Sequence, residues 1–230
     1  MTTSEANMPW LRNVTPGTAF YFGGHRWTVL DHTPEGGTLA IMADFLSYEV
    51  FDEQNCNDWR VSSLRAYLND KENGFYGKLA NYLIDPLSNK GYSDLRGLFM
   101  PITSNLTAAD GMTDYGTSED YISLLSCDQY YKYYKLIPHI ERGYWTLTPL
   151  TCSEDSAGHT RVIGASGALS TPYGFNAIRG VRPLCKLNSD MLVSIKKPEE
   201  EIDIHKSITC AECGAKLGSK YHMVDLAKDS

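Results

Sequence analysis

The stretch "IRGVRPLCKL" (178–187) decides where the folded part of the chain ends. Its apolar residues Val181, Leu184 and Leu187 can face a core around a bend at Pro183. Proline cannot donate a hydrogen bond to a sheet, so it predicts an edge strand or a bulge at this point. The character of the chain changes immediately afterwards. The stretch therefore predicts the closing strand of a domain.

The composition is that of an ordinary globular protein. The 230 residues are 42% hydrophobic and 21% charged. A formal net charge of −7 at pH 7 argues against binding to nucleic acid or to an anionic membrane, because both require a basic surface. The chain shows neither a signal peptide nor a run of about 18 apolar residues that would span a membrane. We expect a protein made in the cytosol, with no membrane or nucleic-acid partner.

The order of elements predicts an α+β protein. Three β-rich runs at 18–24, 26–32 and 37–43 precede helices at 58–70 and about 74–84. Long polar connections follow, and strands return towards the end of the chain. The later elements are expected as a strand at 119–126, a short helix at 127–137, and strands at 143–148, 160–165, 167–171 and 181–187. Strands and helices do not alternate, so we expect a mostly antiparallel twisted sheet with two main helices and long irregular loops.

The same pattern predicts the domain organisation. One large domain is flanked by a short lead-in and by a charged segment that contains "KKPEEEIDIHKS". The expected limits are 1–14 for the lead-in, 15–188 for the domain, 189–207 for the charged linker and 208–230 for a tail with a Cys-x-x-Cys knuckle.

Three sequence landmarks stand in a characteristic order: "WRVSSLRAYLN" (59–69), "DYISLLSCDQYYKY" (120–133) and "GYWTLTPL…GVRPLCKL" (143–187). Together they resemble a bacterial and phage domain of unknown function. That domain is similar to the formylglycine-generating-enzyme branch of C-type lectin-like folds, which includes ligand-binding proteins diversified by retroelements. The resemblance implies a C-type lectin-like fold over 15–188. We also expect scaffold roles for five residues of these landmarks: Trp59, Arg65, Trp145, Gly180 and Arg182. Arg182 is expected to anchor buried carbonyl groups or a carboxylate.

Two positions depart from the pattern of that family. Its tryptophan-containing strand ends in Arg-Ser-Pro, whereas this chain has Leu147, Thr148 and Pro149 and lacks the positive side chain. Cys127 stands before Asp128, the acidic residue expected after Leu-Leu-Ser. Binding roles that the family assigns to these positions therefore do not carry over.

The C-terminal third of the domain is rich in residues suited to recognition. Small hydroxyl groups make adaptable hydrogen bonds, and aromatic rings give large contact areas at low entropic cost. The candidate ligand-binding residues are Thr146, Thr148, Thr151, Ser153, Asp155, His159, Tyr173, Phe175 and Asn176. An ordinary polar surface on β-turns explains the same composition. The resemblance favours a non-enzymatic protein that binds a protein or glycan on a cell surface. The protein is expected to be a phage virion component or the target of a diversity-generating retroelement, located in the virion or in the cytoplasm.

Two further functions stay open. A formylglycine-generating-type oxidase would use a cysteine pair, but the corresponding interval holds only Cys152, and Cys185 lies in the closing strand. The chain has no Gly-x-Ser-x-Gly, His-Glu-x-x-His or phosphate-loop motif, and no lectin-type calcium motif. A structural decoration protein of a virion is the other alternative.

The tail carries the motif "CAECG" (210–214). Cys210 and Cys213 have the spacing of a zinc knuckle, and His205 and His222 could complete a tetrahedral site. A single Cys-x-x-Cys motif is equally compatible with a free or oxidised dithiol. The tail could also tether the protein, pair with a second copy or bind a virion partner.

Overall fold

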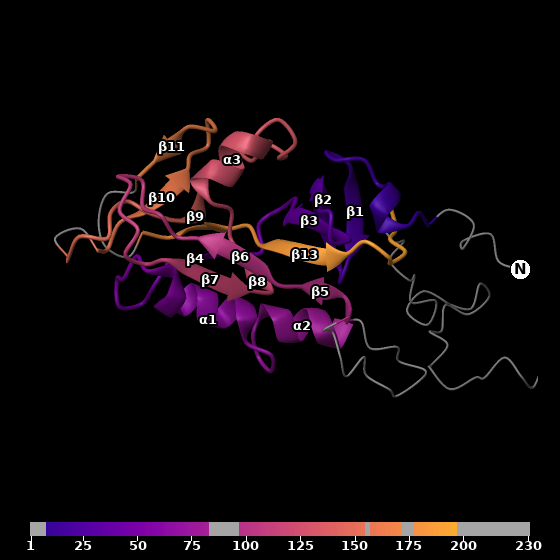
Figure 1. The fold of residues 1–230 in the computed structure, drawn as a ribbon, viewed down its shortest axis with the longest axis horizontal. Helices are drawn as coiled ribbons and strands as arrows, with labels where there is room; N and C mark the ends of the chain where they lie inside the picture. Colours follow the sequence, from indigo (N-terminus) through magenta and orange to yellow (C-terminus); the bar gives the residue numbers. More distant parts are fainter. Residues whose placement is uncertain (1–7, 83–96, 155–156, 172–176, 197–230) are drawn as a thin grey trace, which may run out of the picture. The chain divides into compact units, whose positions relative to one another are not determined.

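The computed structural model describes residues 8–82, 97–154, 157–171 and 177–196, all within one compact unit (Figure 1). Strands come first, two helices follow, and strands return after them. The α+β class and the mostly antiparallel pairing are confirmed. Within the described ranges, no helix has the length and apolar character needed to pass through a membrane.

Most of the strands are short. They are β1 Ala19–Phe22, β2 His25–His32, β3 Gly37–Met42, β4 Ser47–Glu49, β5 Phe99–Met100, β6 Ile102–Asn105, β7 Thr117–Asp120, β8 Ile122–Ser123, β9 Tyr144–Pro149, β10 Thr160–Ile163, β11 Leu169–Ser170, β12 Arg179–Val181 and β13 Leu184–Asn188. The helices in the described residues are α1 Ser63–Asn69, α2 Phe75–Tyr82 and α3 Cys127–Tyr133, with 3-10 turns η2 Leu11–Asn13 and η3 Trp59–Val61.

The strands pair in three sheets. A six-stranded sheet has the order β1-β2-β3-β13-β5, with β8 also paired to β13. A five-stranded sheet has the order β11-β10-β9-β12-β4, and β6 pairs with β7. Among these pairs, β9 and β12 run parallel, with Tyr144 opposite Gly180, and the others are antiparallel.

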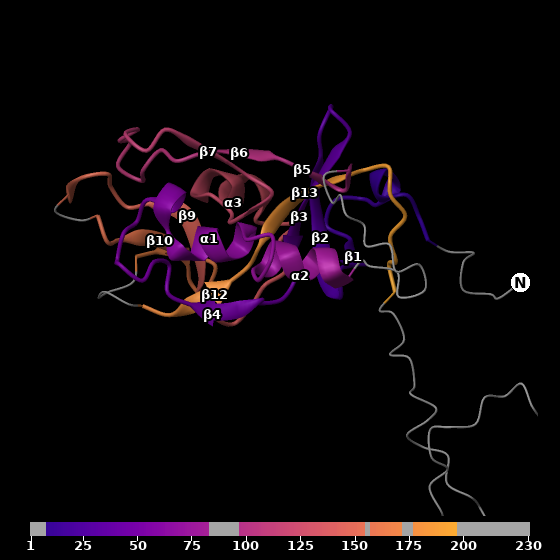
Figure 2. The same cartoon turned by 90° about the horizontal axis from the view of Figure 1, so that it is seen from below.

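The central strands are buried on both faces because helices cover both sides. Figures 1 and 2 show α1 and α2 on one side of the strands and α3 on the other. Every residue of β3 is buried. Ala40 and Met42 belong to the core cluster that includes Phe75 of α2, whereas Ile41 belongs to the cluster that includes Tyr133 of α3. This two-sided burial explains why residues 39–42 are continuously apolar instead of alternating.

The closing stretch forms two strands in two different sheets. β12 belongs to the five-stranded sheet and β13 to the six-stranded sheet, with Arg182 and Pro183 between them. The prediction of one bent strand at 181–187 was therefore wrong. Proline ends the pairing in one sheet, and the chain continues in the other. The strand expected at 119–126 is likewise divided, into β7 and β8.

A second segment makes the same change of sheet beside the first. Residues 42–47 connect β3 to β4, which pair with β13 and β12 respectively. The Met42 amide donates to the Pro183 carbonyl and the Leu46 amide donates to the Val181 carbonyl, both at 2.9 Å. These hydrogen bonds therefore join residues 42–47 to residues 181–183 where both segments pass from one sheet to the other.

The helix expected at 58–70 begins later, at Ser63. Its first residues form η3, and the Ser62 hydroxyl caps α1 by accepting from the Arg65 amide at 3.2 Å. A continuous helix over 58–70 would place Val61 on the same buried face as Leu64 and Leu68, but Val61 is 68% exposed. The 3-10 turn rotates this residue away from the face that a continuous helix would bury.

The folded unit extends beyond both ends of the expected range 15–188. Leu11 is fully buried and Val193 is 2% exposed. The Leu11 amide donates to the Met191 carbonyl at 2.8 Å, and the Val193 amide donates to the Pro9 carbonyl at 3.1 Å. The segments assigned to the lead-in and to the start of the linker thus pair with each other and complete the core.

Gly180 allows β12 to pass close to an aromatic ring, which gives a test of the packing. A Cβ at Gly180 would overlap the ring of Phe45, whereas a Cβ at Gly97 would meet nothing within 4 Å. We expect Gly180→Ala to lower the free energy of unfolding by about 1–3 kcal/mol through overpacking. Gly97→Ala should change it by less than about 0.5 kcal/mol. Urea denaturation measures both, and equal effects would contradict the close approach.

Candidate functional site

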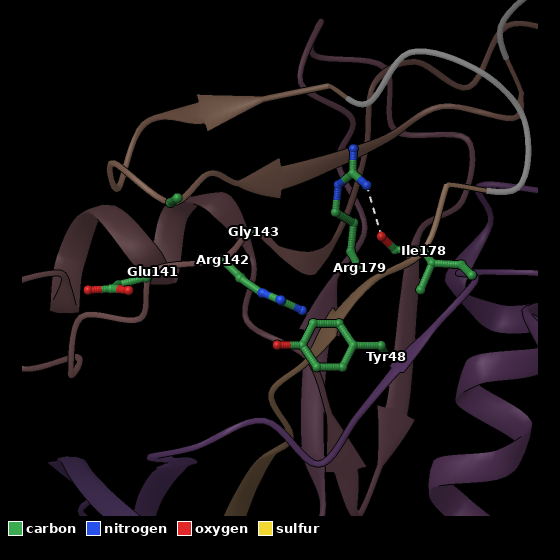
Figure 3. A pocket seen from close by; sticks show the side chains of 7 residues that line it. Tyr48, Glu141, Arg142, Gly143, Ile178 and Arg179 are labelled. Atoms are coloured by element: carbon green, nitrogen blue, oxygen red, sulfur yellow. Dashed lines mark hydrogen bonds between the residues drawn. The ribbon is translucent and has the colours of Figure 1, made fainter.

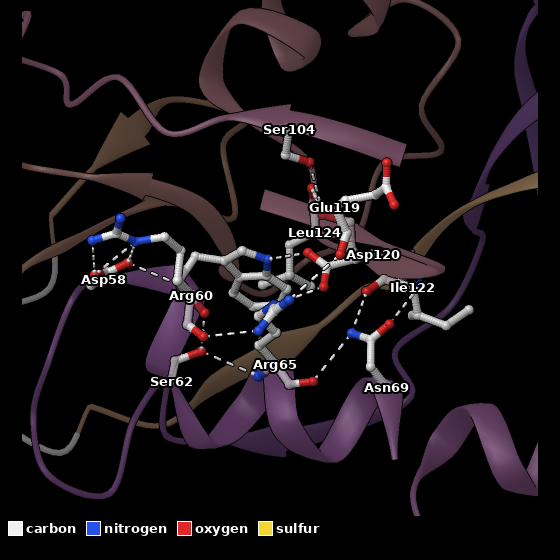
Figure 4. A network of polar contacts seen from close by, with 12 residues as sticks. Asp58, Arg60, Ser62, Arg65, Asn69, Ser104, Glu119, Asp120, Ile122 and Leu124 are labelled. Carbon is white, nitrogen blue, oxygen red and sulfur yellow. Dashed lines mark hydrogen bonds and ion pairs between the residues drawn. The ribbon is translucent and has the colours of Figure 1, made fainter. Parts of the chain in front are cut away.

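The first sequence landmark, residues 59–69, contacts β7 through the side chains of Trp59 and Arg65. The Trp59 ring is fully buried, and its Nε1 donates to Oδ2 of Asp120 at 2.9 Å. Arg65 Nε donates to the other carboxylate oxygen, Oδ1, at 2.7 Å (Figure 4). Asp120 is itself buried, so these two donors compensate for the loss of water around its charge.

Asn69 extends this contact to the next strand. Its Nδ2 donates to the Ile122 carbonyl at 2.8 Å, and its Oδ1 accepts from the Ile122 amide at 3.1 Å (Figure 4). A side-chain amide that satisfies both backbone groups of one residue replaces a strand partner. The polar residues of α1 therefore hold the helix against β7 and β8.

Arg182 lies at the change of sheet and is 1% exposed. Its Nε and Nη2 donate to the carbonyls of Met42 and Ala43 at 3.1 and 3.2 Å, and its Nη1 donates to the Pro138 carbonyl at 3.2 Å. The guanidinium also lies 4.9 Å from the centre of the Tyr144 ring. Loss of water lowers the pKa of Arg182, while the nearby Tyr144 opposes that shift. Carbonyl anchoring is one of the two roles the sequence suggested.

Trp145 and Gly180 fix the arrangement of β9, β12 and β4. Trp145 Nε1 donates to the Glu49 carbonyl at 2.9 Å, across the intervening β12. The Gly180 amide donates to the Gly143 carbonyl at 3.0 Å. These bonds set the relative positions of three neighbouring strands.

Two candidate ligand-binding residues lie inside the protein. Thr146 is fully buried in β9 and donates to the Arg161 carbonyl at 2.8 Å. Thr148 is 6% exposed, and its hydroxyl accepts from the Cys127 amide at 3.0 Å. The expectation that they belong to an exposed face was wrong. Their hydroxyl groups satisfy backbone groups of β10 and α3, which allows polar side chains in a strand buried on both faces.

Thr151, Ser153 and His159 lie in the loop after β9 and are half-buried. Asn57 holds this loop, because its Nδ2 donates to the carbonyls of Thr151 and His159, both at 2.9 Å. The Tyr115 hydroxyl donates to Asn57 Oδ1 at 2.8 Å. The structure thus joins these three candidates to a polar cluster that the sequence did not indicate.

Several expected site residues lie outside the described part of the chain. They are the candidate ligand-binding residues Asp155, Tyr173, Phe175 and Asn176 and the candidate zinc ligands His205, Cys210, Cys213 and His222.

The two cysteines of the oxidase alternative occupy different environments. Cys185 is fully buried in β13, in register with Ala40 and Ile122, and burial raises the pKa of its thiol well above the ordinary value. Cys152 lies in the loop after β9, where its Sγ donates to the Met112 carbonyl at 3.9 Å. In the part of the chain that is described, no three His, Cys, Asp or Glu side chains are grouped to hold a metal ion.

An open pocket of about 550 Å³ lies at the other end of β9 (Figure 3). Strands that neighbour each other in the order β9-β12-β4 bring its walls together from distant parts of the chain. It is lined by Tyr48, Glu141, Arg142, Gly143, Ala165, Ile178 and Arg179. The length of β9, about 17 Å at the usual rise per residue, separates this pocket from the loop after β9.

The pocket combines exposed apolar surface with positive charge. Tyr48 is 42% exposed and Ile178 is 58% exposed. The Arg142 guanidinium lies 5.3 Å from the centre of the Tyr48 ring, and Arg179 Nη1 donates to the Ile178 carbonyl at 2.8 Å (Figure 3). Glu141 points away from both guanidinium groups. Among the described residues, neither arginine forms an ion pair.

Sequence reasoning did not find this pocket. Arg179 stands within the closing stretch, but Tyr48 and Arg142 stand far from it in the sequence and form no motif with it. They meet because β12 lies between β4 and β9. The available signal was weak: an exposed tyrosine in the short run "SYE" and an arginine just before a strand.

Comparison with known proteins adds no family to these observations. No protein-family model matches the chain, and no curated protein or solved structure is significantly similar to it. The assignment of function therefore depends on the residues described above.

The buried guanidinium gives a prediction about stability. We expect Arg182→Met to lower the free energy of unfolding by about 3 kcal/mol or more, because three carbonyl groups lose their charged donor and each unsatisfied buried group costs about 1–3 kcal/mol. Arg26→Met is the control, because Arg26 forms only an exposed ion pair with Asp44, worth about 0–1 kcal/mol. Urea denaturation compares them. Similar losses in the two variants would show that the carbonyl contacts of Arg182 contribute little.

The buried tyrosines give a prediction about pH. Burial is the main cause that raises the pKa of Tyr144 and Tyr115 from 10.0 to about 12. Because the folded state disfavours their ionised forms, this stabilisation is complete below pH 10 and is lost as the pH rises towards 12. Tyr144→Phe should flatten the loss of stability over this interval. Tyr134→Phe, at a residue that is 53% exposed, should leave it unchanged. Urea unfolding at a series of alkaline pH values, with tyrosinate absorbance, tests both outcomes.

Proposed function

We propose that this chain is a non-enzymatic recognition protein with a C-type lectin-like domain that binds its ligand at the pocket beside β4, β9 and β12. The observation that carries the proposal is the exposure of Tyr48 and Ile178 next to two arginines that have no ion-pair partner among the described residues. Concave sites with apolar walls and a few polar groups are where small ligands and sugar units bind.

The landmarks of the sequence resemblance support the domain assignment. Trp59 and Arg65 in the first landmark both bond to Asp120 at the start of the second. In the third, Arg182 holds the place where the chain changes sheet. Residues that define a shared fold are expected in such scaffold contacts, and here each landmark contributes at least one.

The side chains of the pocket favour binding over catalysis. Arginine remains protonated and serves as a donor, so Arg142 and Arg179 can orient an acceptor group but cannot act as general bases. Tyr48 and Ile178 offer contact area. Charged donors beside apolar side chains can hold a ligand in one orientation.

The resemblance also suggests the setting of this activity. A protein or glycan on a cell surface is the proposed partner, and a phage virion or a retroelement-diversified receptor-binding protein is the proposed context. The tail that carries Cys210 and Cys213 would tether the domain, join copies of it or bind zinc. A decoration protein that binds nothing is the alternative that the following experiment separates.

The proposal predicts that removing the apolar walls weakens binding without unfolding the protein. We expect Tyr48→Ala combined with Ile178→Ala to reduce the binding of labelled protein to a glycan array and to intact bacteria by about tenfold or more, because interface aromatics carry much of the binding energy. The melting temperature should fall by no more than a few degrees, since both side chains are partly exposed.

The control variant replaces exposed apolar residues elsewhere. Val61→Ala combined with Tyr131→Ala removes side chains that are 68% and 64% exposed and do not line the pocket. Binding should remain at the wild-type level. An equal loss in both double variants, or no loss in either, would reject the pocket as the recognition site. No binding by the wild-type protein to any array component or bacterium would favour the decoration protein.

A further inference from the structure

We infer that the pocket binds a sugar that carries a carboxylate, with Arg142 holding the carboxylate, Arg179 adding positive charge from the neighbouring strand, and Tyr48 and Ile178 contacting the ring. This inference rests on the proposed function and names its ligand class. A guanidinium group matches a carboxylate in shape and charge and can bind it through two parallel hydrogen bonds.

The charge of these two arginines stands out against the rest of the described structure. Four other arginines have a carboxylate partner, namely Arg12 with Asp190, Arg26 with Asp44, Arg60 with Asp58 and Arg65 with Asp120. Arg161 donates instead to the Thr171 hydroxyl at 2.8 Å. Arg142 and Arg179 line one pocket and have no such partner among the described residues. In a chain with a formal net charge of −7, this leaves a local positive site in an acidic protein.

Both guanidinium groups are positioned before a ligand arrives. The Arg142 guanidinium lies 5.3 Å from the centre of the Tyr48 ring, a contact that favours its charge and leaves its N–H groups to donate to a ligand. Arg179 uses Nη1 for the Ile178 carbonyl, and its remaining N–H groups are free to donate to a ligand. Figure 3 shows the Arg142 side chain, from the segment before β9, directed towards Tyr48, whereas the Arg179 side chain, from β12, points away from the Tyr48 ring. Prior ordering of this kind reduces the entropic cost of binding.

The neighbouring surface fits a ring better than a bare anion. The Tyr48 ring and the Ile178 side chain are exposed beside the charges, so the apolar face of a sugar ring can pack against them while its carboxylate meets the arginines. The volume of about 550 Å³ is in the usual range for a small ligand, about 300–1,000 Å³. A simple inorganic ion would leave this apolar surface uncovered.

The overall charge favours a group with one negative charge. A polyphosphate or a nucleic acid would meet long-range repulsion from the acidic chain. Glu141 on the rim adds a local negative charge that opposes a doubly charged phosphate more than a carboxylate. The carboxylate oxygens of Glu141 can also accept hydrogen bonds from sugar hydroxyl groups near the rim.

Titration of the full chain with trigalacturonate and with its methyl ester tests the inference by calorimetry. The ester keeps the rings and removes the charge. We expect the acid to bind at least about tenfold more tightly than the ester, with an affinity that falls as salt rises. Arg142→Gln should remove most of that difference, and Arg179→Gln a smaller part of it. Arg26→Gln removes the same charge from a guanidinium that Asp44 already neutralises, and it should leave the affinity unchanged.

The other outcomes distinguish this inference from the proposed function. Equal binding of acid and ester, or tighter binding of a poly-glutamate peptide than of the sugar, overturns the inference. Absence of binding to trigalacturonate, to glucuronate oligomers and to sialyllactose also overturns it. In each case the proposed function stands if the Tyr48→Ala/Ile178→Ala variant still loses binding on the array or to bacteria.

A blocking variant checks the location independently of charge. Ala165→Trp would fill the pocket from the loop after β10, and Ala168→Trp adds the same bulk to an exposed position in that loop that does not line the pocket. We expect the first to abolish acid-sugar binding and the second to preserve it. Binding that survives Ala165→Trp overturns the assignment of the sugar to this pocket.

Discussion

The guanidinium of Arg182 compensates for a break in the backbone pairing that the whole fold depends on. Two segments leave one sheet and join the other side by side, and at the crossing the carbonyls of Met42 and Ala43 point to a buried space. A buried carbonyl without a donor is costly, and arginine can satisfy several at once. The Tyr144 ring, 4.9 Å away, supplies a favourable face for the buried charge. The carbonyl groups at the crossing thus keep a donor, and the charge of Asp44 also favours the protonated form of Arg182.

This crossing creates the pocket. Because β12 and β4 separate from the six-stranded sheet, they can pair with each other next to β9. The pairing brings Tyr48, Arg142 and Arg179 to one place, although they come from three distant segments. The bond from Trp145 to the Glu49 carbonyl and the close contact between Gly180 and Phe45 then fix the distances between the strands. The same contacts that stabilise the core thus set the geometry of the pocket.

Local sequence pattern was enough to predict the elements but not how they join. The first three strands and the positions of the helices follow from periodicity, turn residues and helix caps, which act over a few residues. The division of the closing stretch between two sheets depends on partners more than a hundred residues away, and Pro183 signalled only that regular pairing would end. The pairing of Leu11 with Met191 was missed for the same reason, since neither segment has a strong pattern of its own.

The search for binding residues failed where it relied on residue type. Thr146 and Thr148 have side chains suited to contacting a ligand, but in a strand covered on both faces their hydroxyl groups serve the backbone of neighbouring elements. A small hydroxyl residue fits an exposed paratope and a buried strand equally well. Arginine is more informative, because leaving it inside a fold requires compensation that the structure makes visible. Arg182 is compensated by carbonyl groups and Arg65 by Asp120, whereas Arg142 and Arg179 lie at the surface of a pocket with donors left over. Arg142 and Arg179, which keep donors that the described fold does not use, are therefore the arginines that support the proposed ligand site.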